Sequence, residues 1–268
     1  MINYYEICLK VCEISRQTGQ FIALEGSKFN TSLVEQKGRH DYVSYVDRSA
    51  EAQIVNKLRE ILPEAGFIAE EGTASNKGEI YNWIIDPLDG TTNFVHGVPV
   101  YSISIALMEN TDIVMGVVYE INLDECFYAW KNGKAMLNNK EIHVSESDNF
   151  DKALLATGFP YYDYGYLDAY LEVFKHFMQH TAGLRRLGSA AADLAYVACG
   201  RFEGFYEYGL NPWDVAAGAF IVEIAGGKVT DFNGEKNYIF GRELIAASKT
   251  IHPEILSVIK QLFKGISS

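Results

Sequence analysis

Cysteine and basic residues are both scarce in this chain. Its 268 residues include four cysteines and 23 lysines and arginines, against 35 aspartates and glutamates, so the formal net charge is −12. So acidic a chain repels nucleic acid and anionic lipid, which argues against non-specific binding to either. Cys8 and Cys12 lie one helical turn apart, Cys126 and Cys199 are distant from both, and no C-x-x-C pair occurs. This cysteine usage is typical of a reduced, cytoplasmic protein.

Long hydrophobic runs are missing as well. The longest apolar stretch, Val98 to Met108, is too short to span a bilayer and is interrupted by serines. The first residues, Met1 to Glu6, carry neither the basic region nor the cleavage signal of a secretory leader. We therefore expect a soluble, cytoplasmic protein. With 48% hydrophobic residues, the chain can bury a substantial core in one large domain or two closely packed ones.

The spacing of apolar residues predicts a different architecture in each half of the chain. In the first half we expect two helices on an antiparallel sheet, an α+β arrangement. The helices are predicted over about 2–25 and 48–62, and the strands over 66–72, 83–86, 101–109, 113–121 and 126–130, with short strands within 136–144.

In the second half, strands and helices alternate, which is typical of α/β layering. Strands are predicted over 153–157, 184–187, 203–207, 228–231 and 244–248, and helices over 166–180, 189–199, 213–225 and 252–264. The polar segment 145–151 marks the predicted boundary. We accordingly divide the chain into an N-terminal α+β subdomain, residues 1–147, and a C-terminal α/β subdomain, residues 148–268.

The stretch from Trp83 to Phe94 carries the strongest chemical signal. Its apolar run ends in Asp86 and Asp89, and Pro87 starts a tight turn that brings both carboxylates to one side. The backbone carbonyl of Leu88 is expected to point with them. Two carboxylates and a carbonyl are hard oxygen ligands that suit Mg²⁺. The same letters also occur in ordinary surface turns, so this motif needs support from elsewhere in the chain.

A phosphate site is expected directly beside this metal site. Gly90 and Thr91 follow the carboxylates and would present free backbone N–H groups at a helix start, where phosphate binds. Two carboxylates about 4 Å apart repel each other by roughly 4 kcal/mol at an effective dielectric constant near 20. An acidic site that binds phosphate must therefore take up cations, which invert the local field.

Three motifs together resemble those of one enzyme family. The run from Trp83 to Phe94 resembles the central motif of the inositol monophosphatase family, which belongs to the Mg²⁺-dependent, lithium-sensitive phosphatases. Glu70-Glu71-Gly72 resembles its E-E-[SG] metal motif, and Asn211 to Gly218 resembles its second signature, W-D-x-A-[AG]-G. Their shared order argues against a chance match. The resemblance covers essentially the whole chain and implies a layered α-β-α-β-α sandwich of the inositol monophosphatase/fructose-1,6-bisphosphatase type, usually a homodimer.

The resemblance also implies a catalytic and a metal-binding set. Two or three Mg²⁺ ions would be held by Glu70, Asp86, the Leu88 carbonyl, Asp89 and Asp214. Glu70 and the Thr91 hydroxyl would activate the attacking water, and Asp47 would form a hydrogen bond with Thr91. Asp47 lies in a stretch similar to the family pattern D-x-V-T-x-x-D, with Ser44 in place of the threonine. From position alone, Asp47 is expected to cap the second helix and Asp214 to favour the dipole of its own helix, roles compatible with function.

A substrate-binding set follows from the same resemblance. Leu187 to Ala191 resembles the family's G-[TS]-A-A substrate segment, and Glu207 matches a glutamate that binds a ring hydroxyl in members acting on inositol phosphates. An exposed strand-end charge is the alternative for Glu207. Arg185 and Arg186 resemble a basic pair of bacterial members, one of which could reach the substrate, the subunit interface or only solvent. The predicted substrate-binding residues are Leu88, Asp89, Gly90, Thr91, Arg185, Gly188, Ser189, Ala190, Glu207 and Asp214.

The predicted function is Mg²⁺-dependent hydrolysis of myo-inositol monophosphate to myo-inositol and phosphate by an activated water. The nearest alternative is the same chemistry on fructose 1,6-bisphosphate, a nucleotide 3′-phosphate or NADP. A second alternative belongs to a different class, because some bacterial members similar to this chain also bind the transcription or ribosome machinery. The acidic composition disfavours direct nucleic-acid binding in that role but is compatible with a protein partner.

Overall fold

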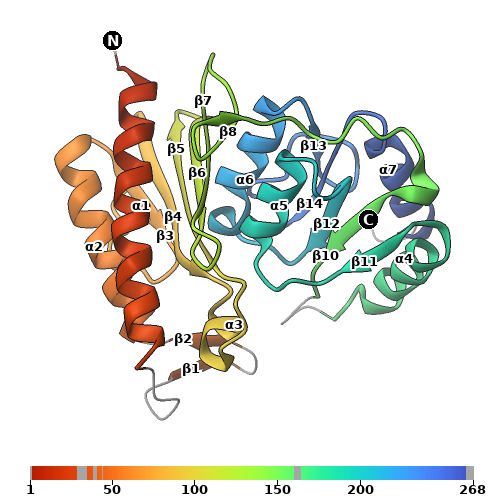
Figure 1. Ribbon diagram of the computed structural model, residues 1–268, viewed down its shortest axis with the longest axis horizontal. Coiled ribbons are helices and arrows are strands. Elements are labelled where there is room, and N and C mark those ends of the chain that lie inside the picture. The colour runs from red at the N-terminus through yellow and green to blue at the C-terminus, as the bar shows by residue number, and fades with distance from the viewer. Residues whose placement is uncertain (1, 29–34, 39–40, 44, 160–163, 264–268) are drawn as a thin grey trace.

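Helices and sheets alternate across the molecule in the order α-β-α-β-α, from α1 and α2 at the left of Figure 1 to α4 and α7 at the right. The computed structural model describes residues 2–28, 35–38, 41–43, 45–159 and 164–263. The layered sandwich expected from the sequence is confirmed. The helices are α1 (Tyr4–Gly26), α2 (Tyr45–Ile61), α3 (Thr91–His96), α4 (Leu167–His180), α5 (Ala190–Ala198), α6 (Pro212–Ile224) and α7 (His252–Leu262).

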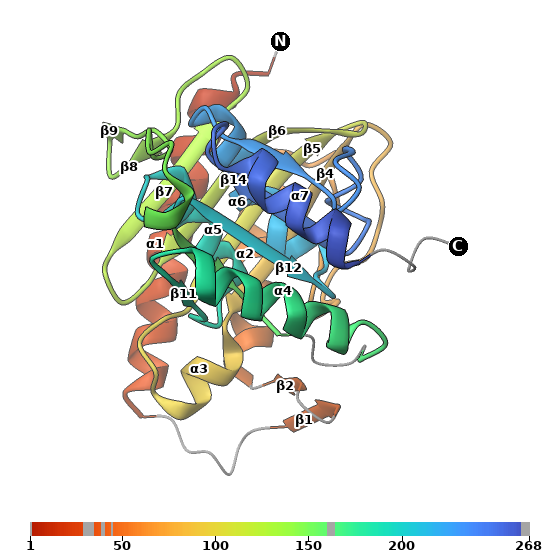
Figure 2. The same cartoon turned by 90° about the vertical axis from the view of Figure 1, so that its right-hand side faces the viewer.

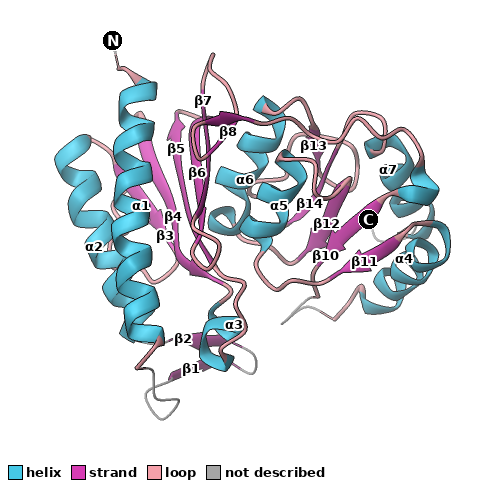
Figure 3. Cartoon of the chain, in the orientation of Figure 1, coloured by secondary structure: helices cyan, strands magenta, loops and turns pink. Residues whose placement is uncertain are grey.

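The first large sheet lies between the α1–α2 pair and the α5–α6 pair, as the magenta strands of Figure 3 show. Its strand order is β3-β4-β5-β6-β7-β8-β9. The strands are β3 (Gly66–Ala69), β4 (Tyr81–Asp89), β5 (Ser102–Glu109), β6 (Asp112–Glu120), β7 (Glu125–Trp130), β8 (Met136–Leu137) and β9 (Lys140–Glu141). A small separate hairpin is formed by β1 (Glu35–Gly38) and β2 (Asp41–Val43).

The expectation of a purely antiparallel first sheet is wrong at its edge. Strand β3 runs parallel to β4, whereas the other neighbouring strands of this sheet are antiparallel. The segment between the two strands, residues 70–80, runs back beside β3 before β4 begins, so the two strands point the same way. The Phe67 N–H donates to the Asn76 carbonyl at 2.8 Å and holds the returning chain in place. The ends of β3 and β4 therefore point the same way, which matters for the site below.

The second sheet has the strand order β11-β10-β12-β14-β13. Its strands are β10 (Leu154–Thr157), β11 (Gly183–Arg185), β12 (Gly204–Tyr208), β13 (Lys228–Thr230) and β14 (Glu243–Ala247), and a short 3-10 turn, Phe150–Lys152, precedes them. Strands β11, β10 and β12 are parallel, and β14 and β13 continue antiparallel. Helices α4 and α7 cover its outer face, which Figure 2 turns toward the viewer.

Alternation of side chains along the strands builds the successive cores. On β4, Trp83 and Ile85 are buried against the face covered by α1 and α2, whereas Ile84 between them is buried on the α5–α6 side. This period of two is what a strand covered on both faces requires. Along β12, Phe205 likewise belongs to the core beneath α5 and α6, whereas Tyr206 packs in the outer core with α4 and α7.

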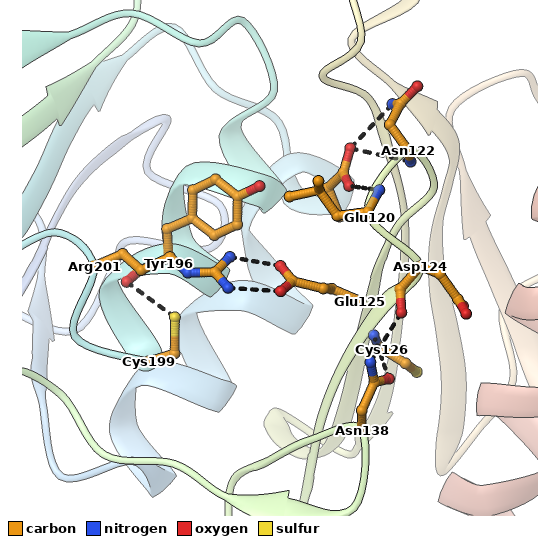
Figure 4. A network of polar contacts seen from close by, with 10 residues as sticks. Glu120, Asn122, Asp124, Glu125, Cys126, Asn138, Tyr196, Cys199 and Arg201 are labelled. Carbon is orange, nitrogen blue, oxygen red and sulfur yellow. Dashed lines mark hydrogen bonds and ion pairs between the residues drawn. The ribbon is translucent and has the colours of Figure 1, made fainter.

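The two halves of the chain share the central core. The first sheet ends at residue 141 and the second begins at residue 154, but the core between them contains side chains from both, among them Phe127 and Leu194. Arg201 reinforces this contact, because its guanidinium pairs with both carboxylate oxygens of Glu125 at 2.5 and 2.6 Å and covers the Tyr196 ring (Figure 4). The division at residues 147 and 148 stays a prediction.

The cysteines and the helices agree with the absence of disulfide and membrane signals in the sequence. All four cysteines are free thiols, with Cys8, Cys12 and Cys126 buried and Cys199 partly exposed. No helix within the described ranges combines the length and apolarity needed to cross a bilayer.

Candidate active site

Asp86 and Asp89 end strand β4 at a local irregularity of the sheet. The pairing between β4 and β5 shifts register between these two residues, and such a bulge redirects side chains at a strand end. Asp86 is 2% exposed, and its Oδ1 accepts a hydrogen bond from the Leu88 N–H at 2.9 Å, which spans Pro87. The backbone stays in β4 through Asp89, so a bulge and a side-chain hydrogen bond across Pro87 take the place of the predicted tight turn.

Glu70 and Asp214 reach the same place from two other elements. Glu70 directly follows β3 and donates its N–H to the Ile85 carbonyl at 3.2 Å, because β3 and β4 are parallel and end together. Asp214 lies in the first turn of α6, where its Oδ2 accepts the Asn211 N–H at 2.7 Å. The Ser104 hydroxyl donates to the Trp213 carbonyl at 2.8 Å and fixes that turn on β5.

The charges of these four carboxyl groups act on one another, which indicates that the groups lie close together. Burial, followed by the charge of Asp214, raises the pKa of Glu70, and burial together with Glu70, Asp89 and Asp214 raises the pKa of Asp86. Burial raises the pKa of Asp89 to about 6, although hydrogen bonds from Ser189 and Ala191 oppose this rise. Burial and the charge of Asp89 raise the pKa of Asp214 to about 7. The cluster is thus repulsive, and positive charge would stabilise it.

The chemistry of these donors fits Mg²⁺. Across the described ranges, no three His, Cys, Asp or Glu side chains have the arrangement of a preformed metal cage. The donors themselves are nevertheless hard oxygens, and Glu70, Asp89 and Asp214 are each partly exposed, so that a cation can reach them. A divalent cation would also offset the mutual repulsion that raises their pKa values.

Asp89 is held by the N-terminus of α5. Its Oδ2 accepts hydrogen bonds from the Ser189 hydroxyl at 2.6 Å and from the Ala191 N–H at 2.7 Å. Ser189 is the N-cap of α5, and the Ala190 side chain beside it is buried. The predicted substrate segment therefore supports a predicted metal ligand directly.

Thr91 begins the short helix α3 and contacts Asp47. The Thr91 hydroxyl lies 3.0 Å from Asp47 Oδ1 and 3.1 Å from the Leu88 carbonyl oxygen, so it can donate its single proton to either. Asp47 is 1% exposed. The expectation that Asp47 caps α2 is wrong, because this helix already begins at Tyr45 and places Asp47 within its first turn. Ser44, in the same motif, lies outside the described residues.

Gly90 and Gly188 bring the starts of α3 and α5 close together. Both have positive φ, 96° and 93°. A Cβ on Gly90 would lie 3.2 Å from the Gly188 carbonyl oxygen, and a Cβ on Gly188 would lie 2.5 Å from Arg186 Nη1. Glycine at both positions thus provides the backbone conformation and the close approach that the site needs.

Glu207 is buried at the other side of the site. Its carboxyl group on β12 packs directly on Gly158, where any Cβ would lie within 2.0 Å of it, and the side chain is 8% exposed. The alternative of an exposed strand-end charge is therefore wrong. Burial raises the pKa of Glu207. The charge of Arg186 opposes this rise, and the charges of Asp214 and Asp89 add to it.

Arg186, and not Arg185, faces these carboxylates. Arg185 is exposed, and its guanidinium donates to the neighbouring Leu184 carbonyl at 3.0 Å. The predicted role of Arg185 in substrate binding stays a prediction, and of the two arginines only Arg186 acts on the buried carboxylates. Successive side chains at a strand end point to opposite sides, and this turns Arg186 toward Asp89 and Glu207, whose pKa values it lowers.

Several polar residues of the site were not singled out from the sequence. Asn93 is buried, and its amide donates to the Val100 carbonyl at 2.7 Å and the Leu187 carbonyl at 2.8 Å, which ties the two glycine loops together. Asp193 is 1% exposed in α5, all of whose residues are buried. A charge inside so apolar and alanine-rich a helix is a signal that the sequence already contains. Glu51 on α2 was not singled out either; it is 0% exposed and bonds the segment that follows Glu70.

The chain was compared with known proteins. A model of the inositol monophosphatase family matches residues 6–263. The chain is 40% identical over 246 residues to the putative Nus factor SuhB of Neisseria meningitidis, covering 91% of this chain and 94% of that protein. It is 36% identical over 255 residues to the fructose-1,6-bisphosphatase/inositol-1-monophosphatase of Thermotoga maritima, covering 95% and 96%. The solved structure of extragenic suppressor protein suhB from Bartonella henselae superimposes with a TM-score of 0.90 at 36% identity, covering 97% and 99%.

The order of the layers and the carboxylates gathered at the end of β4 define the class of layered sandwiches that the inositol monophosphatases share. Since the family model spans nearly the whole chain, the protein belongs to the inositol monophosphatase family.

Proposed function

We propose that this protein is a Mg²⁺-dependent phosphatase that hydrolyses myo-inositol monophosphate to myo-inositol and phosphate. One observation carries the proposal. Glu70, Asp86, Asp89 and Asp214 come from three separate parts of the fold and meet beside the Thr91 hydroxyl and the N-termini of α3 and α5. Such a cluster costs stability through repulsion, which favours a role in binding cations over a structural one.

Glu70, Asp86, the Leu88 carbonyl, Asp89 and Asp214 would hold the Mg²⁺ ions, two or three in number. When bound, Mg²⁺ supplies positive charge that lowers the pKa of a nearby water and neutralises charge on the phosphate and the leaving oxygen. The ligands are fixed by the rest of the site, since Asp89 is bonded to α5 and Asp214 to Asn211. Such outer support is what keeps carboxylate ligands in place.

The chain's own groups would then orient the reactants. Gly90 and Thr91 N–H groups would bind the phosphate, and the Thr91 hydroxyl, within reach of Asp47, would accept a hydrogen bond from the attacking water. Glu70 would take the proton of that water as it attacks phosphorus in line. The phosphorus–oxygen bond to the alcohol breaks, and the leaving oxygen takes a proton from solvent. No covalent phosphoenzyme is needed.

Glu207 supports a hydroxylated substrate. Its carboxyl group is buried close to Asp214 and Asp89, where it can accept a hydrogen bond from a ring hydroxyl of the alcohol. The alternative is the same chemistry on fructose 1,6-bisphosphate, an activity that the name of the Thermotoga maritima relative also includes, or on a nucleotide 3′-phosphate or NADP.

Phosphate release from a substrate panel tests the proposal. With Mg²⁺ present, the purified protein should hydrolyse inositol 1-phosphate with a higher kcat/KM than any other substrate of the panel. Asp89→Asn should lower kcat/KM by roughly a hundredfold or more, since even residues that only support a ligand contribute 10–100-fold. The matched control is Asp112→Asn, an exposed residue of the β5–β6 hairpin, which should be fully active. Full activity of Asp89→Asn would contradict the assignment of Asp89 to the metal. A higher kcat/KM for another phosphate ester would change the proposed substrate but keep the proposed mechanism.

A second candidate function is the binding of a protein partner. It is motivated by the name of the Neisseria meningitidis relative, putative Nus factor SuhB. The net charge of −12 disfavours direct binding to nucleic acid, so a protein is the proposed partner. Affinity capture with the Asp89→Asn protein would test this role independently of catalysis, and capture of no partner would count against it.

A homodimer and a cytoplasmic location are proposed from the family resemblance. Light scattering on the purified chain tests whether it is a dimer.

A further inference from the structure

Glu51 on α2 is a completely buried carboxylate that the proposed mechanism does not use. It is 0% exposed. Its oxygens accept three hydrogen bonds, each at 2.7 Å, from the Glu71 N–H, the Thr73 N–H and the Thr73 hydroxyl. All three donors belong to the segment that directly follows Glu70. A carboxylate is removed from water at a cost of several kcal/mol unless its oxygens are bonded, so this contact compensates a substantial penalty.

Glu51 and Asp47 stand one turn apart on the same face of α2. Residues four apart on a helix are neighbours, so this face presents two carboxyl groups side by side. Asp47 accepts from the Thr91 hydroxyl, at the end of β4, and Glu51 accepts from the segment after β3. Helix α2 therefore contacts both strand ends that carry the carboxylate cluster.

The backbone around Glu70 is consequently held from two sides. The Glu70 N–H donates to the Ile85 carbonyl on β4, and the next N–H, that of Glu71, donates to Glu51. Between Glu71 and Thr73 the chain reverses at Gly72, whose φ is 70° and where an added Cβ would meet nothing within 4 Å. The Glu51 carboxylate anchors this segment at both Glu71 and Thr73, on either side of the glycine.

We propose that Glu51 is a positioning residue that sets the orientation of Glu70, and with it the affinity of the site for Mg²⁺. This inference rests on the proposed function, since it assigns Glu70 to the metal. Glu51 acts through the backbone of Glu71 and Thr73 and makes no contact with substrate. Groups that hold a metal ligand in this indirect way typically contribute 10–100-fold to metal affinity.

The same loop offers a matched control at its far end. Asn82 accepts a hydrogen bond from the Gly78 N–H at 2.9 Å and donates to the Gly78 carbonyl at 3.2 Å. Asn82 thus anchors the loop that follows β3, but at a point eight residues beyond Glu70. Loss of either anchor loosens the loop, whereas only loss of Glu51 releases the part that carries Glu70.

The test is calorimetric titration of Mg²⁺ into the full-length protein without substrate, a readout that does not depend on activity. Glu51→Gln is expected to weaken Mg²⁺ binding about tenfold, and Asn82→Ala to bind like the wild type. Glu51→Asp keeps the charge but is one methylene shorter, and it too should bind more weakly. In phosphate release, the half-saturating Mg²⁺ concentration should rise by the same factor while kcat at saturating Mg²⁺ stays close to that of the wild type.

Three results would overturn the inference. The first is wild-type Mg²⁺ affinity in Glu51→Gln. The second is wild-type Mg²⁺ affinity in Glu51→Asp, which would leave only an effect of the charge. The third is an equal loss of Mg²⁺ affinity in Asn82→Ala, which would indicate a general loosening of the loop. If Glu51→Gln does not fold, Thr73→Val decides, because it removes one of the three donors from an exposed residue. Its expected loss is a factor of about three, and unchanged affinity would overturn the inference. A wild-type protein that binds no Mg²⁺ would overturn the proposed function as well, and this separates the two failures.

Discussion

Arg186 lies among three acidic side chains. Burial raises the pKa of Asp89, Asp193 and Glu207, and the charge of Arg186 opposes the rise in each case. The Arg186 guanidinium also lies 5.5 Å from the centroid of the Phe159 ring, and its Nη1 would lie 2.5 Å from a Cβ on Gly188. At the residue scale, Arg186 therefore offsets part of the negative charge around Glu207, on the side of the site where we propose that the substrate binds.

We predict that Arg186→Gln raises KM for inositol 1-phosphate about tenfold with a smaller change in kcat. The reason is that a charged hydrogen-bonding group is worth about 1.5–3 kcal/mol, and 1.4 kcal/mol is a factor of ten. Steady-state phosphate release at saturating Mg²⁺ measures both constants. The neighbouring exposed residue supplies the control, since Arg185→Gln should keep the wild-type KM. The reverse outcome, with Arg185 sensitive and Arg186 tolerant, would contradict the geometry described above.

The docking of α7 on the second sheet depends on a buried histidine. His252 begins α7, is 0% exposed, and has its Nε2 2.9 Å from the Thr230 hydroxyl on β13. That hydroxyl donates its proton to the Asp231 carbonyl at 2.8 Å, so Nε2–H is the donor to the Thr230 hydroxyl. Within the described residues, Nδ1 has no hydrogen-bond partner. Burial and the charge of Lys228 lower the pKa of His252 from 6.5 to about 4.

At the element scale, this predicts a loss of stability in mild acid. The unfolded chain takes up a proton below its pKa of 6.5, whereas the folded chain resists until about 4, so the stabilisation is complete above 6.5 and is lost as the pH falls. Between pH 7 and pH 5, the free energy of unfolding should fall by about 2 kcal/mol more in the wild type than in His252→Gln. Urea denaturation at both pH values measures the difference. An equal fall in the free energy of unfolding between pH 7 and pH 5 in the two proteins would show that His252 does not titrate in this range.

The central core joins the two halves of the chain. Ile84, Ala106, Val118 and Phe127 of the first sheet are buried against α5 and α6, which belong to the second half of the chain. A fragment ending at residue 147 would expose this entire sheet face to water. Since burial of apolar surface contributes about 25 cal/mol per Å², the loss is large compared with the 5–15 kcal/mol stability of a typical domain.

At the scale of the whole molecule, we therefore predict that residues 1–147 expressed alone do not fold. The fragment should lack near-ultraviolet circular dichroism and should bind a hydrophobic dye, whereas the full chain should unfold in a single transition. An independent, cooperative unfolding transition of the fragment would mean that the subdomain division is real in energetic terms and that the shared core matters less than its burial suggests.

The sequence alone determined most of the order of the elements, although not the β1–β2 hairpin, and the chemistry of the proposed metal ligands. Both follow from local patterns. The apolar run before Asp86 predicts a buried strand, and the motifs around Glu70 and Asp214 predict carboxylates at strand and helix ends. These features depend on residues close together in the chain, where backbone preferences and side-chain period act directly.

Only the tertiary structure decided how distant segments meet. Three such features join elements that are separated in sequence: the parallel pairing of β3 with β4, the action of Arg186 on the buried carboxylates, and the three hydrogen bonds to Glu51. Each depends on the register between strands or the direction of one side chain, and a shift of one residue reverses either. A single sequence carries no local signal for that choice, because the free energy that makes it comes from packing between the layers.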